Sequence, residues 1–456
     1  MHTEAAAPNT VILPTVDARV PARMLDALDA VAEEVSRRLS PTLPRAAGLF
    51  RAAFRNTLET TVRPQDDGTV YVITGDIPAM WLRDSAAQVR PYLRLAADDT
   101  DFAGLLVGVV RRQWRYIRHD PYANAFNETA DGATWDPSDV TAMTPLVWER
   151  KYEIDSLCYP LLLAADVHAV TGRTDHLAAD FVAAAERILD VWDAEVDHDR
   201  DSPYAFYRAG EGLARDGRGT PTAPTGLLWS GFRPSDDPCE RHFLVPANAM
   251  AAVAGERLAE LLTTTSTMAD GTLRATLAAR ARAHATRIRA ALAVHAVVEH
   301  PARGRIYAYE VDGLGGAVLM DDANVPSLLS LPYLGWCAPD DPLYTATRAF
   351  VLSPDNPYYY AGRYAAGVGS PHQGEAPRVW PIALAVQGLT TTDPAEREAL
   401  LTTLAACDAD TGLMHEEFHV DDPADFTRPW FAWANSMFAE LCLLHAGMPV
   451  LGGDRS

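Results

Sequence analysis

Two turn-rich segments of the chain place carboxylates next to each other. Asp236 and Asp237 are adjacent in WSGFRPSDDPCERHFLVPAN, and Glu416 and Glu417 are adjacent in GLMHEEFHVDD. Neighbouring carboxylates disfavour each other's ionisation, so one member of a pair can keep its proton near neutral pH and serve as a general acid. A carboxylate from the second segment, across a pocket, would complete an acid–base couple. The competing interpretation is that one of the two aspartates caps the helix expected over residues 247–264.

A third segment, TGDIPAMWLRDSAAQVRPY at residues 74–92, carries side chains suited to hold a sugar. The ring of Trp81 offers a flat face to the C–H side of a sugar, and Arg83 and Asp84 offer donors and acceptors for vicinal hydroxyls. The same pair could instead be an ion pair that pins a loop, and Asp84 or Ser85 could be the N-cap of the next helix. Position alone favours neither interpretation.

Other polar residues stand in similar connections. Arg233 accompanies the aspartate pair, and Arg428 precedes two tryptophans in FTRPWFAWANS. His372 in GVGSPH could belong to a turn, since a lone histidine is more often structural than catalytic. The segment MDDANVPSLL fits a simple N-cap, and about half of the charges in VWERKYEIDSLCYP would be surface charges at a helix start.

Composition excludes several classes of partner and chemistry. The chain has 456 residues and a formal charge of −22, which would repel nucleic acid and anionic membrane surfaces. Its five cysteines lack CxxC spacing, and we find no Walker loop, GxGxxG, GxSxG or HExxH motif, so we expect no metal and no cofactor. The N-terminal residues do not resemble a secretory signal, and no apolar run reaches membrane-spanning length. We therefore expect a soluble, cytoplasmic protein.

The elements that must position these residues are mostly helical. Strand-like runs are few, TVYVITGD and GRIYAYEVDG being the best, and residues 197–225 are typical of a long loop or lid. Apolar residues recur with helical spacing over about 22–40, 44–61, 85–97, 102–118, 149–171, 176–196, 247–264, 271–297, 325–336, 376–390, 395–406 and 428–446. We predict an all-α fold, an (α/α)6 barrel with a few short β-hairpins. It would be a single catalytic domain over residues 1–456, with a core of about 22–447, and its pocket would be ringed by loops.

Six segments resemble the signature segments of glycoside hydrolase family 125, the exo-α-1,6-mannosidases. They are TGDIPAMWLRDSAAQV, VWERKYEIDSLCYP, WSGFRPSDD, MDDANVPSLLSLPYLG, VWPIALAVQGLT and FTRPWFAWANS, and the resemblance spans about residues 44–447. It implies an (α/α)6 barrel that needs no metal and removes terminal α-1,6-linked mannose with inversion at the anomeric carbon. The substrate would be a mannose-terminated oligosaccharide or glycan.

The resemblance also implies roles for individual residues. The general acid would be Asp236 or Asp237, with Asp236 slightly favoured, and the general base would be Glu416. Glu417 is the weaker base candidate, because the family usually has a small residue at that position. The terminal mannose would be held by Trp81, Arg83, Asp84, Arg233, Asn248, His372 and Arg428.

Three other functions fit the same residues. Another inverting (α/α)6 glycosidase would differ in the sugar it releases, and a toroid epimerase or isomerase would need histidines facing the pocket. A carbohydrate-binding protein would need the tryptophan and arginine but no pair of carboxylates. We expect a monomer or a weak homo-oligomer, and the sequence does not identify the natural glycan.

Overall fold

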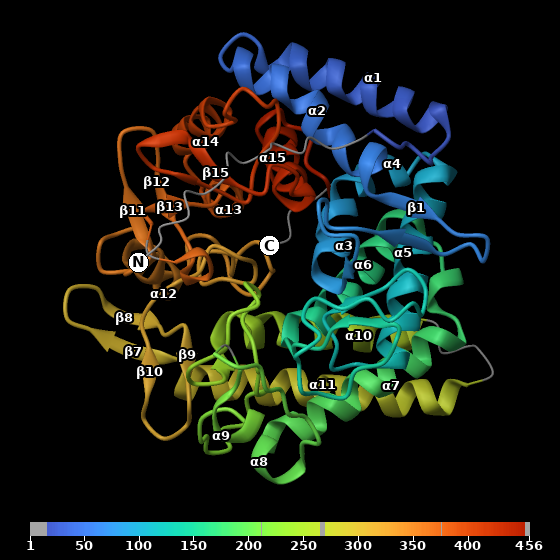
Figure 1. Ribbon diagram of the computed structural model, residues 1–456, viewed down its shortest axis with the longest axis vertical. Helices are drawn as coiled ribbons and strands as arrows, with labels where there is room; N and C mark the ends of the chain where they lie inside the picture. The colour runs from blue at the N-terminus through green and yellow to red at the C-terminus, as the bar shows by residue number, and fades with distance from the viewer. Residues whose placement is uncertain (1–15, 211, 265–269, 375, 452–456) are drawn as a thin grey trace, which may run out of the picture.

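The computed structural model describes residues 16–451 except 211, 265–269 and 375. Its helices are arranged in a ring, with the chain running once around it (Figure 1). The longer helices are α1 Ala22–Leu39, α2 Pro44–Thr60, α3 Leu82–Val89, α5 Thr100–His119, α6 Ile154–Thr171, α7 Ala179–Ala194, α10 Val245–Thr264, α11 Gly271–His295, α12 Pro342–Val351, α13 Pro381–Thr390, α14 Pro394–Ala406 and α15 Ala432–His445. The predicted (α/α)6 architecture is confirmed.

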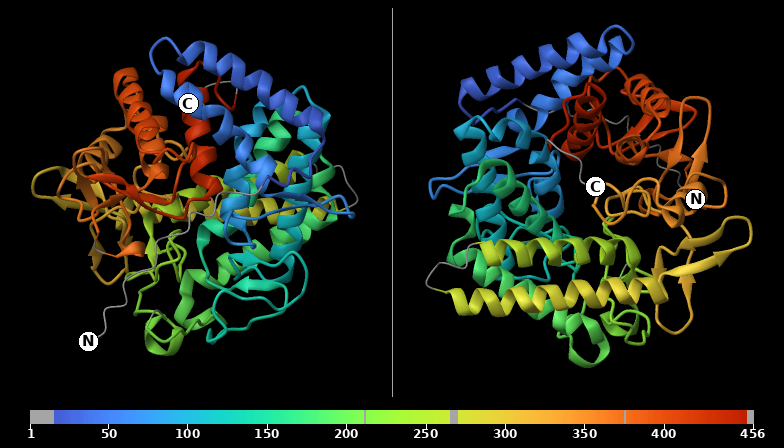
Figure 2. Two further views of the ribbon diagram at one scale, coloured as in Figure 1. Left: turned by 45° about the horizontal axis from the view of Figure 1, so that its top comes forward. Right: turned by 180° about the vertical axis from the view of Figure 1, so that it is seen from behind.

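Five helices form most of the inner layer. Helix α15 packs on α3, α3 on α6, α6 on α10, and α13 on α15, while outer helices such as α5, α11 and α14 cover them. The long pair α10 and α11 lies side by side in the right-hand view of Figure 2. Inner helices are buried almost all round: every residue of α3 is buried, and α6 and α10 are mostly apolar. A helix enclosed by other helices has no face for water, so this burial is expected.

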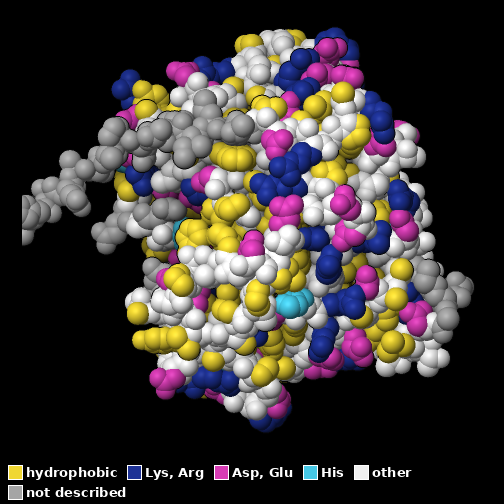
Figure 3. All heavy atoms as spheres, turned by 45° about the vertical axis from the view of Figure 1, so that its right-hand side comes forward, with side chains coloured by type: hydrophobic (Ala, Val, Ile, Leu, Met, Phe, Trp, Pro, Cys, Tyr) yellow, Lys and Arg dark blue, Asp and Glu magenta, His cyan; other side chains and the backbone are white. Residues whose placement is uncertain are grey.

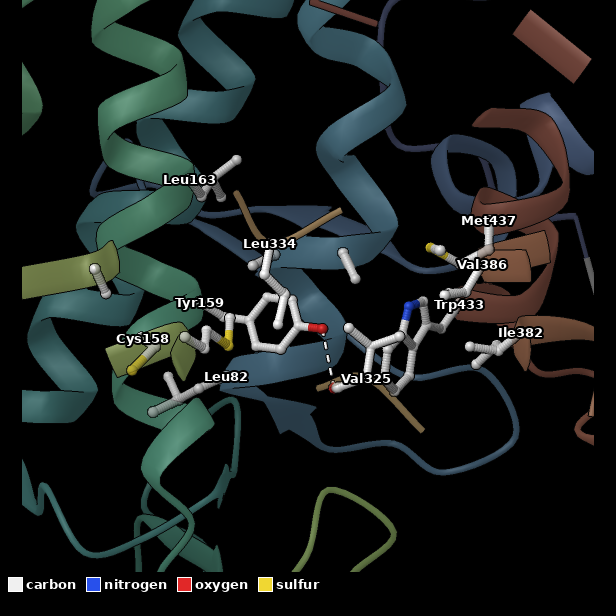
Figure 4. Close-up of a cluster of buried hydrophobic side chains, with 14 of the residues drawn as sticks. Leu82, Cys158, Tyr159, Leu163, Val325, Leu334, Ile382, Val386, Trp433 and Met437 are labelled. Atoms are coloured by element: carbon white, nitrogen blue, oxygen red, sulfur yellow. Dashed lines mark hydrogen bonds between the residues drawn. The ribbon is translucent and has the colours of Figure 1, made fainter. Parts of the chain in front are cut away.

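The sixth inner position is taken by turns, so the helix predicted over residues 325–336 is wrong. Pro326 and Pro332 lack the amide donors that a helix needs. Ser327 and Ser330 instead exchange hydrogen bonds, each backbone amide donating to the other residue's hydroxyl oxygen. The Asp321 carboxylate accepts hydrogen bonds from the backbone amides of Leu328 and Leu329. The segment still closes the ring, because the Tyr159 hydroxyl of α6 donates to the Val325 carbonyl, as Figure 4 shows within the central apolar cluster.

Local sequence explains several helix ends. Asp99, Asp341 and Asp393 each accept hydrogen bonds from amides of the first turn of α5, α12 and α14. Helix α6 ends where Gly172 adopts a φ of 68°. The helix predicted over 85–97 is interrupted at Pro91, giving α3, a 3-10 turn and the short α4 Leu93–Ala96.

Short strands lie in the connections. Three hairpins are β1 Val62–Pro64 with β2 Val70–Val72, β7 Val297–His300 with β8 Gly304–Tyr307, and β11 Tyr359–Ala361 with β12 Ala366–Val368. Three-stranded sheets are formed by β3 Met80–Trp81, β4 Ala125–Phe126 and β5 Val147–Glu149; by β10 Ala317–Val318, β9 Glu310–Val311 and β6 Phe243–Leu244; and by β13 Arg378–Val379, β14 Glu417–His419 and β15 Asp422–Thr427. The first and the last of these sheets border the candidate site.

The expected loop over 197–225 contains two single-turn helices, α8 His198–Asp201 and α9 Ala214–Gly217. It is fastened to the preceding long loop. Val140 and Tyr207 form a β-bridge, and the Arg208 guanidinium contacts both oxygens of Asp139 at 2.6 and 2.8 Å. The side chains of Arg208 and Asp139 are buried, so this ion pair holds the two loops together.

The described surface mixes both signs of charge. Acidic and basic side chains are interspersed on the face in Figure 3, and many are paired, as Arg115 is with Asp67. Within residues 16–451, leaving out the undescribed positions, no helix combines the length and the apolar composition needed to cross a bilayer.

Candidate active site

A cavity of about 180 Å³ lies where the β3–β4–β5 sheet and the β13–β14–β15 sheet meet the inner helices. Its wall is unusually aromatic, with four tryptophans and a phenylalanine among the lining side chains. All but one of these are buried: Trp81, Trp380, Phe431 and Trp433 are at most 5% exposed, whereas Trp135 is 51% exposed. Flat apolar rings beside charged groups are suited to bind a sugar ring, which has both C–H faces and hydroxyls.

Arg83 and Asp84 lie on the first turn of α3 and line this cavity. The helix begins at Leu82, so neither Asp84 nor Ser85 is its N-cap; that position belongs to Trp81, in an extended conformation. Burial raises the pKa of Asp84 to about 6, although Arg83 and Arg428 oppose the rise. The oxygens of this carboxylate can accept hydrogen bonds from the hydroxyls of a ligand.

Arg83 is an ion-pair partner and also lines the cavity, so its position is compatible with both interpretations that the sequence left open. Its Nη1 lies 2.6 Å from Glu153 Oε2 and 3.2 Å from Asp155 Oδ2, so it is a fully buried ion-pair partner. It also lines the cavity, and its Nη2 lies 3.6 Å from Asp236 Oδ1. A guanidinium fixed by two carboxylates presents its remaining N–H groups in a constant direction.

Asp236 and Asp237 have different surroundings. Asp236 lines the cavity and accepts a hydrogen bond of 3.1 Å from Asn124 Nδ2. Asp237 forms a 3.1 Å contact with His372 Nδ1 and accepts from the Ser235 hydroxyl. Neither caps α10, which begins only at Val245. Asp236 has a φ of 68°, a conformation that a non-glycine residue adopts at a cost, and such positions concentrate at functional sites.

Glu153 and Asp236 perturb each other's pKa. Burial raises the pKa of Glu153 well above its usual range, although Arg83 opposes it. Burial acts on Asp236 in the same direction, but Arg83, Lys151 and a hydrogen bond with Glu153 outweigh it and lower the pKa of Asp236 to about 2. Within this interacting pair, Glu153 therefore holds a proton more tightly than Asp236 does.

Glu416 lies immediately before β14, on the opposite side of the cavity, and is buried there. Arg428 Nη1 donates to its Oε1 at 3.0 Å, and the Thr427 hydroxyl donates to its Oε2 at 3.1 Å. Arg428 also donates to Asp76 at 2.7 Å and has a φ of 44°. Glu417 points elsewhere: it pairs with Arg378, and burial raises its pKa to about 7.

His372 lines the cavity beside Asp236. Burial would lower its pKa, but the hydrogen bond and charge of Asp237 outweigh burial and raise it to about 9. The imidazole is therefore a cation at neutral pH, and Asp237 is the carboxylate that holds it.

Two predicted sugar-binding residues are not placed at the cavity. Arg233 is buried against Glu310, with Nε 2.6 Å from Oε1. Asn248 bonds only to backbone: its Oδ1 accepts from the Leu228 amide, and its Nδ2 donates to the carbonyls of Leu228 and Leu244. Asn435 forms the same pattern on α15 with Met414 and Phe431. The polar side chains of Arg233 and Asn248 suggested ligand contacts. In this structure Arg233 pairs with a carboxylate, and Asn248 makes hydrogen bonds with backbone groups.

The sequence pointed only weakly to other residues of the wall. Glu149 and Lys151, which were expected to be partly surface charges, are buried and line the cavity. Trp135, Trp380 and Asn124 were not singled out, and Trp135 could have been noticed as a lone tryptophan in a stretch rich in Asp, Gly and Pro. In the part of the chain that the structure describes, no cluster of three or more His, Cys, Asp or Glu side chains is arranged to hold a metal ion.

Comparison with known proteins shows the family to which the chain belongs. The profile of the GH125 family, metal-independent α-mannosidases, matches residues 44–443. The chain belongs to the GH125 family. It is thus a glycoside hydrolase, and the GH125 match includes both sheets that border the cavity.

Relatives agree with this GH125 assignment. A metal-independent α-mannosidase of Streptococcus pneumoniae, solved as a non-productive complex with α-1,6-mannobiose, is 44% identical with a TM-score of 0.89, covering 94% of this chain and 99% of that one. The meiotically up-regulated gene 157 protein of Schizosaccharomyces pombe is 42% identical over 87% of this chain and 81% of its own length. A bacterial glucoamylase solved with acarbose shares only the fold, with 12% identity and a TM-score of 0.56 over 89% of this chain and 56% of its own.

Proposed function

We propose that this GH125 chain is an exo-acting α-1,6-mannosidase that hydrolyses its substrate with inversion of anomeric configuration. Asp236 is the general acid and Glu416 the general base. The observation that carries the proposal is that two carboxylates from separate hydrogen-bonding networks, the buried Glu416 and the partly buried Asp236, line one aromatic cavity. The solved relative with α-1,6-mannobiose supports the sugar and the linkage.

The terminal mannose would lie among the buried aromatic rings, with Asp84 accepting from its hydroxyls. Glu416 takes a proton from a water molecule, whose oxygen attacks the anomeric carbon from the face opposite the leaving group. As the glycosidic bond breaks, Asp236 gives its proton to the leaving oxygen. Inversion requires room for that water, so the two carboxyl groups should be about 6.5–9.5 Å apart in the complex.

The acid must hold a proton when the substrate is bound. The pair formed by Glu153 and Asp236 keeps one proton, and a glycosidic oxygen beside Asp236 favours the proton on that residue, where it can be donated. Lys151 and Arg83 then stabilise the carboxylate that remains after the transfer. Arg428 and Thr427 fix Glu416 so that its carboxylate faces the water.

Hydrolysis of a linkage-defined panel of mannobioses tests this function. We expect the 1,6-linked isomer to be cleaved preferentially, and the first product seen by proton NMR to be β-mannose. Asp236→Asn and Glu416→Gln should each lower kcat by a factor of at least 10², whereas Asp237→Asn should retain more activity. Release of α-mannose first, or parental activity in Glu416→Gln, would contradict the mechanism.

A cytoplasmic location and a monomeric or weakly associated state are further proposals, based on the composition and the cysteine content. Cell fractionation tests the first, and light scattering on the purified protein tests the second.

A further inference from the structure

Trp135 is the exception among the aromatic side chains of the cavity. Four of the five rings are buried, but about half of the Trp135 side chain is open to solvent. An exposed tryptophan that serves only packing is uncommon, because the largest apolar surface is then left in water. Its place at the cavity suggests that a ligand covers it.

The loop that carries Trp135 is held firmly. The Trp135 amide and the Thr134 hydroxyl both donate to the Trp148 carbonyl, at 3.0 and 3.1 Å. Asn127 Nδ2 donates to the carbonyls of Ala133 and Pro145. The backbone position of the ring is therefore fixed before any ligand arrives, so little order must be created on binding.

Trp135 lies on the side of the cavity that carries the proposed acid. Its partner Trp148 packs against Trp81, and the next residue, Glu149, accepts a 3.0 Å hydrogen bond from Asn124. The same Asn124 amide donates to Asp236 at 3.1 Å. Glu416 and Arg428 instead flank the other sheet, Glu416 just before β14 and Arg428 just after β15.

The proposed mechanism determines which sugar lies on the Asp236 side of the cavity. The acid protonates the leaving oxygen, so the leaving sugar must be on the Asp236 side, while the water is on the Glu416 side. Four of the five aromatic rings at the cavity are buried and Trp135 is half exposed, so a second sugar would extend toward Trp135. We infer that Trp135 is a stacking platform for the sugar on the leaving side of the scissile bond, and that it gives this site its preference for a disaccharide over free mannose. This inference depends on the proposed function.

The test is calorimetric binding with two ligands, mannose and an S-linked α-1,6-thiomannobiose that resists hydrolysis. In Trp135→Ala we expect the Kd of the thiomannobiose to rise about tenfold and that of mannose to change less than twofold. Trp135→Phe should recover part of the loss. Tyr364→Ala is the matched control, since this tyrosine is 43% exposed and is not among the residues that line the cavity.

The outcomes separate the two proposals. Equal weakening of both ligands in Trp135→Ala would place the ring at the terminal mannose and refute the platform, as would unchanged binding of the thiomannobiose. If the parent protein binds thiomannobiose through Trp135 but hydrolyses no mannobiose, the platform stands and the proposed hydrolysis fails. If the parent binds neither ligand, both are refuted.

Discussion

Replacing Asn248 with alanine tests whether this residue serves the fold or the sugar. The side chain is fully buried and makes hydrogen bonds of 2.7, 3.0 and 2.9 Å with the Leu228 amide and with the carbonyls of Leu228 and Leu244. Truncation leaves one buried donor and two acceptors without this partner. At about 1–3 kcal/mol for an unsatisfied donor, and less for each carbonyl, we expect the free energy of unfolding to fall by about 3 kcal/mol.

Urea unfolding followed by tryptophan fluorescence measures this loss, and calorimetry measures the Kd of mannose. We expect the Kd of mannose to change less than twofold, because Asn248 is not among the cavity residues. Glu260→Ala on the same helix is the control: its side chain is mostly exposed, and its loss should cost about 0.5 kcal/mol or less. If Asn248→Ala lost mannose binding while keeping parental stability, the reasoning would be refuted.

Two predictions concern protons. In the Glu153→Gln variant, residue 153 cannot share a proton with Asp236, so kcat/KM should fall. The alkaline limb of the pH profile of kcat/KM should move about one pH unit lower than in the parent. An unmoved limb would count against the proposal that the two residues share a proton. His372 has a pKa raised from 6.5 to about 9, so its contribution to stability is complete below about pH 6.5 and is lost as the pH rises through 9. Thermal unfolding of His372→Gln should therefore depend less on pH between 7 and 9 than that of the parent, and parallel curves would contradict this.

Helical spacing predicted the ring well because outer helices such as α1 and α5 are apolar on one face, while inner helices such as α6 and α10 are long, mostly apolar runs. It failed over residues 325–336, where the apolar pattern is helical but two prolines and a pair of serines enforce turns. The identity of a buried side chain does not reveal its partner, which is why Arg233 and Asn248 resembled ligand-binding residues.

Within the candidate site, the sequence identified the carboxylates but could not rank Asp236 and Asp237. Their difference arises from tertiary contacts: Asn124 lies 112 positions before Asp236 in the chain, and His372 lies 135 positions after Asp237. The opposite pKa shifts of Glu153 and Asp236 are likewise invisible in the sequence, because they depend on Glu153 being buried beside Arg83. Trp135 was missed because aromatic content alone does not distinguish an exposed platform from a core residue.

The matched contacts of Asn248 and Asn435 have a consequence for how a helical barrel shapes its loops. Each is the fourth residue of its helix, and each side-chain amide bonds the amide and carbonyl of one residue in a distant loop, as a neighbouring β-strand would. A primary amide has the donor and acceptor of a peptide group, so the helix contributes one rung of a ladder without any strand. The loop bonded in this way leads to Asp236 in one case and to Glu416 in the other. Each long connection can thus hold its proposed catalytic carboxylate at a fixed position, while the outer part of the connection is free to vary in sequence.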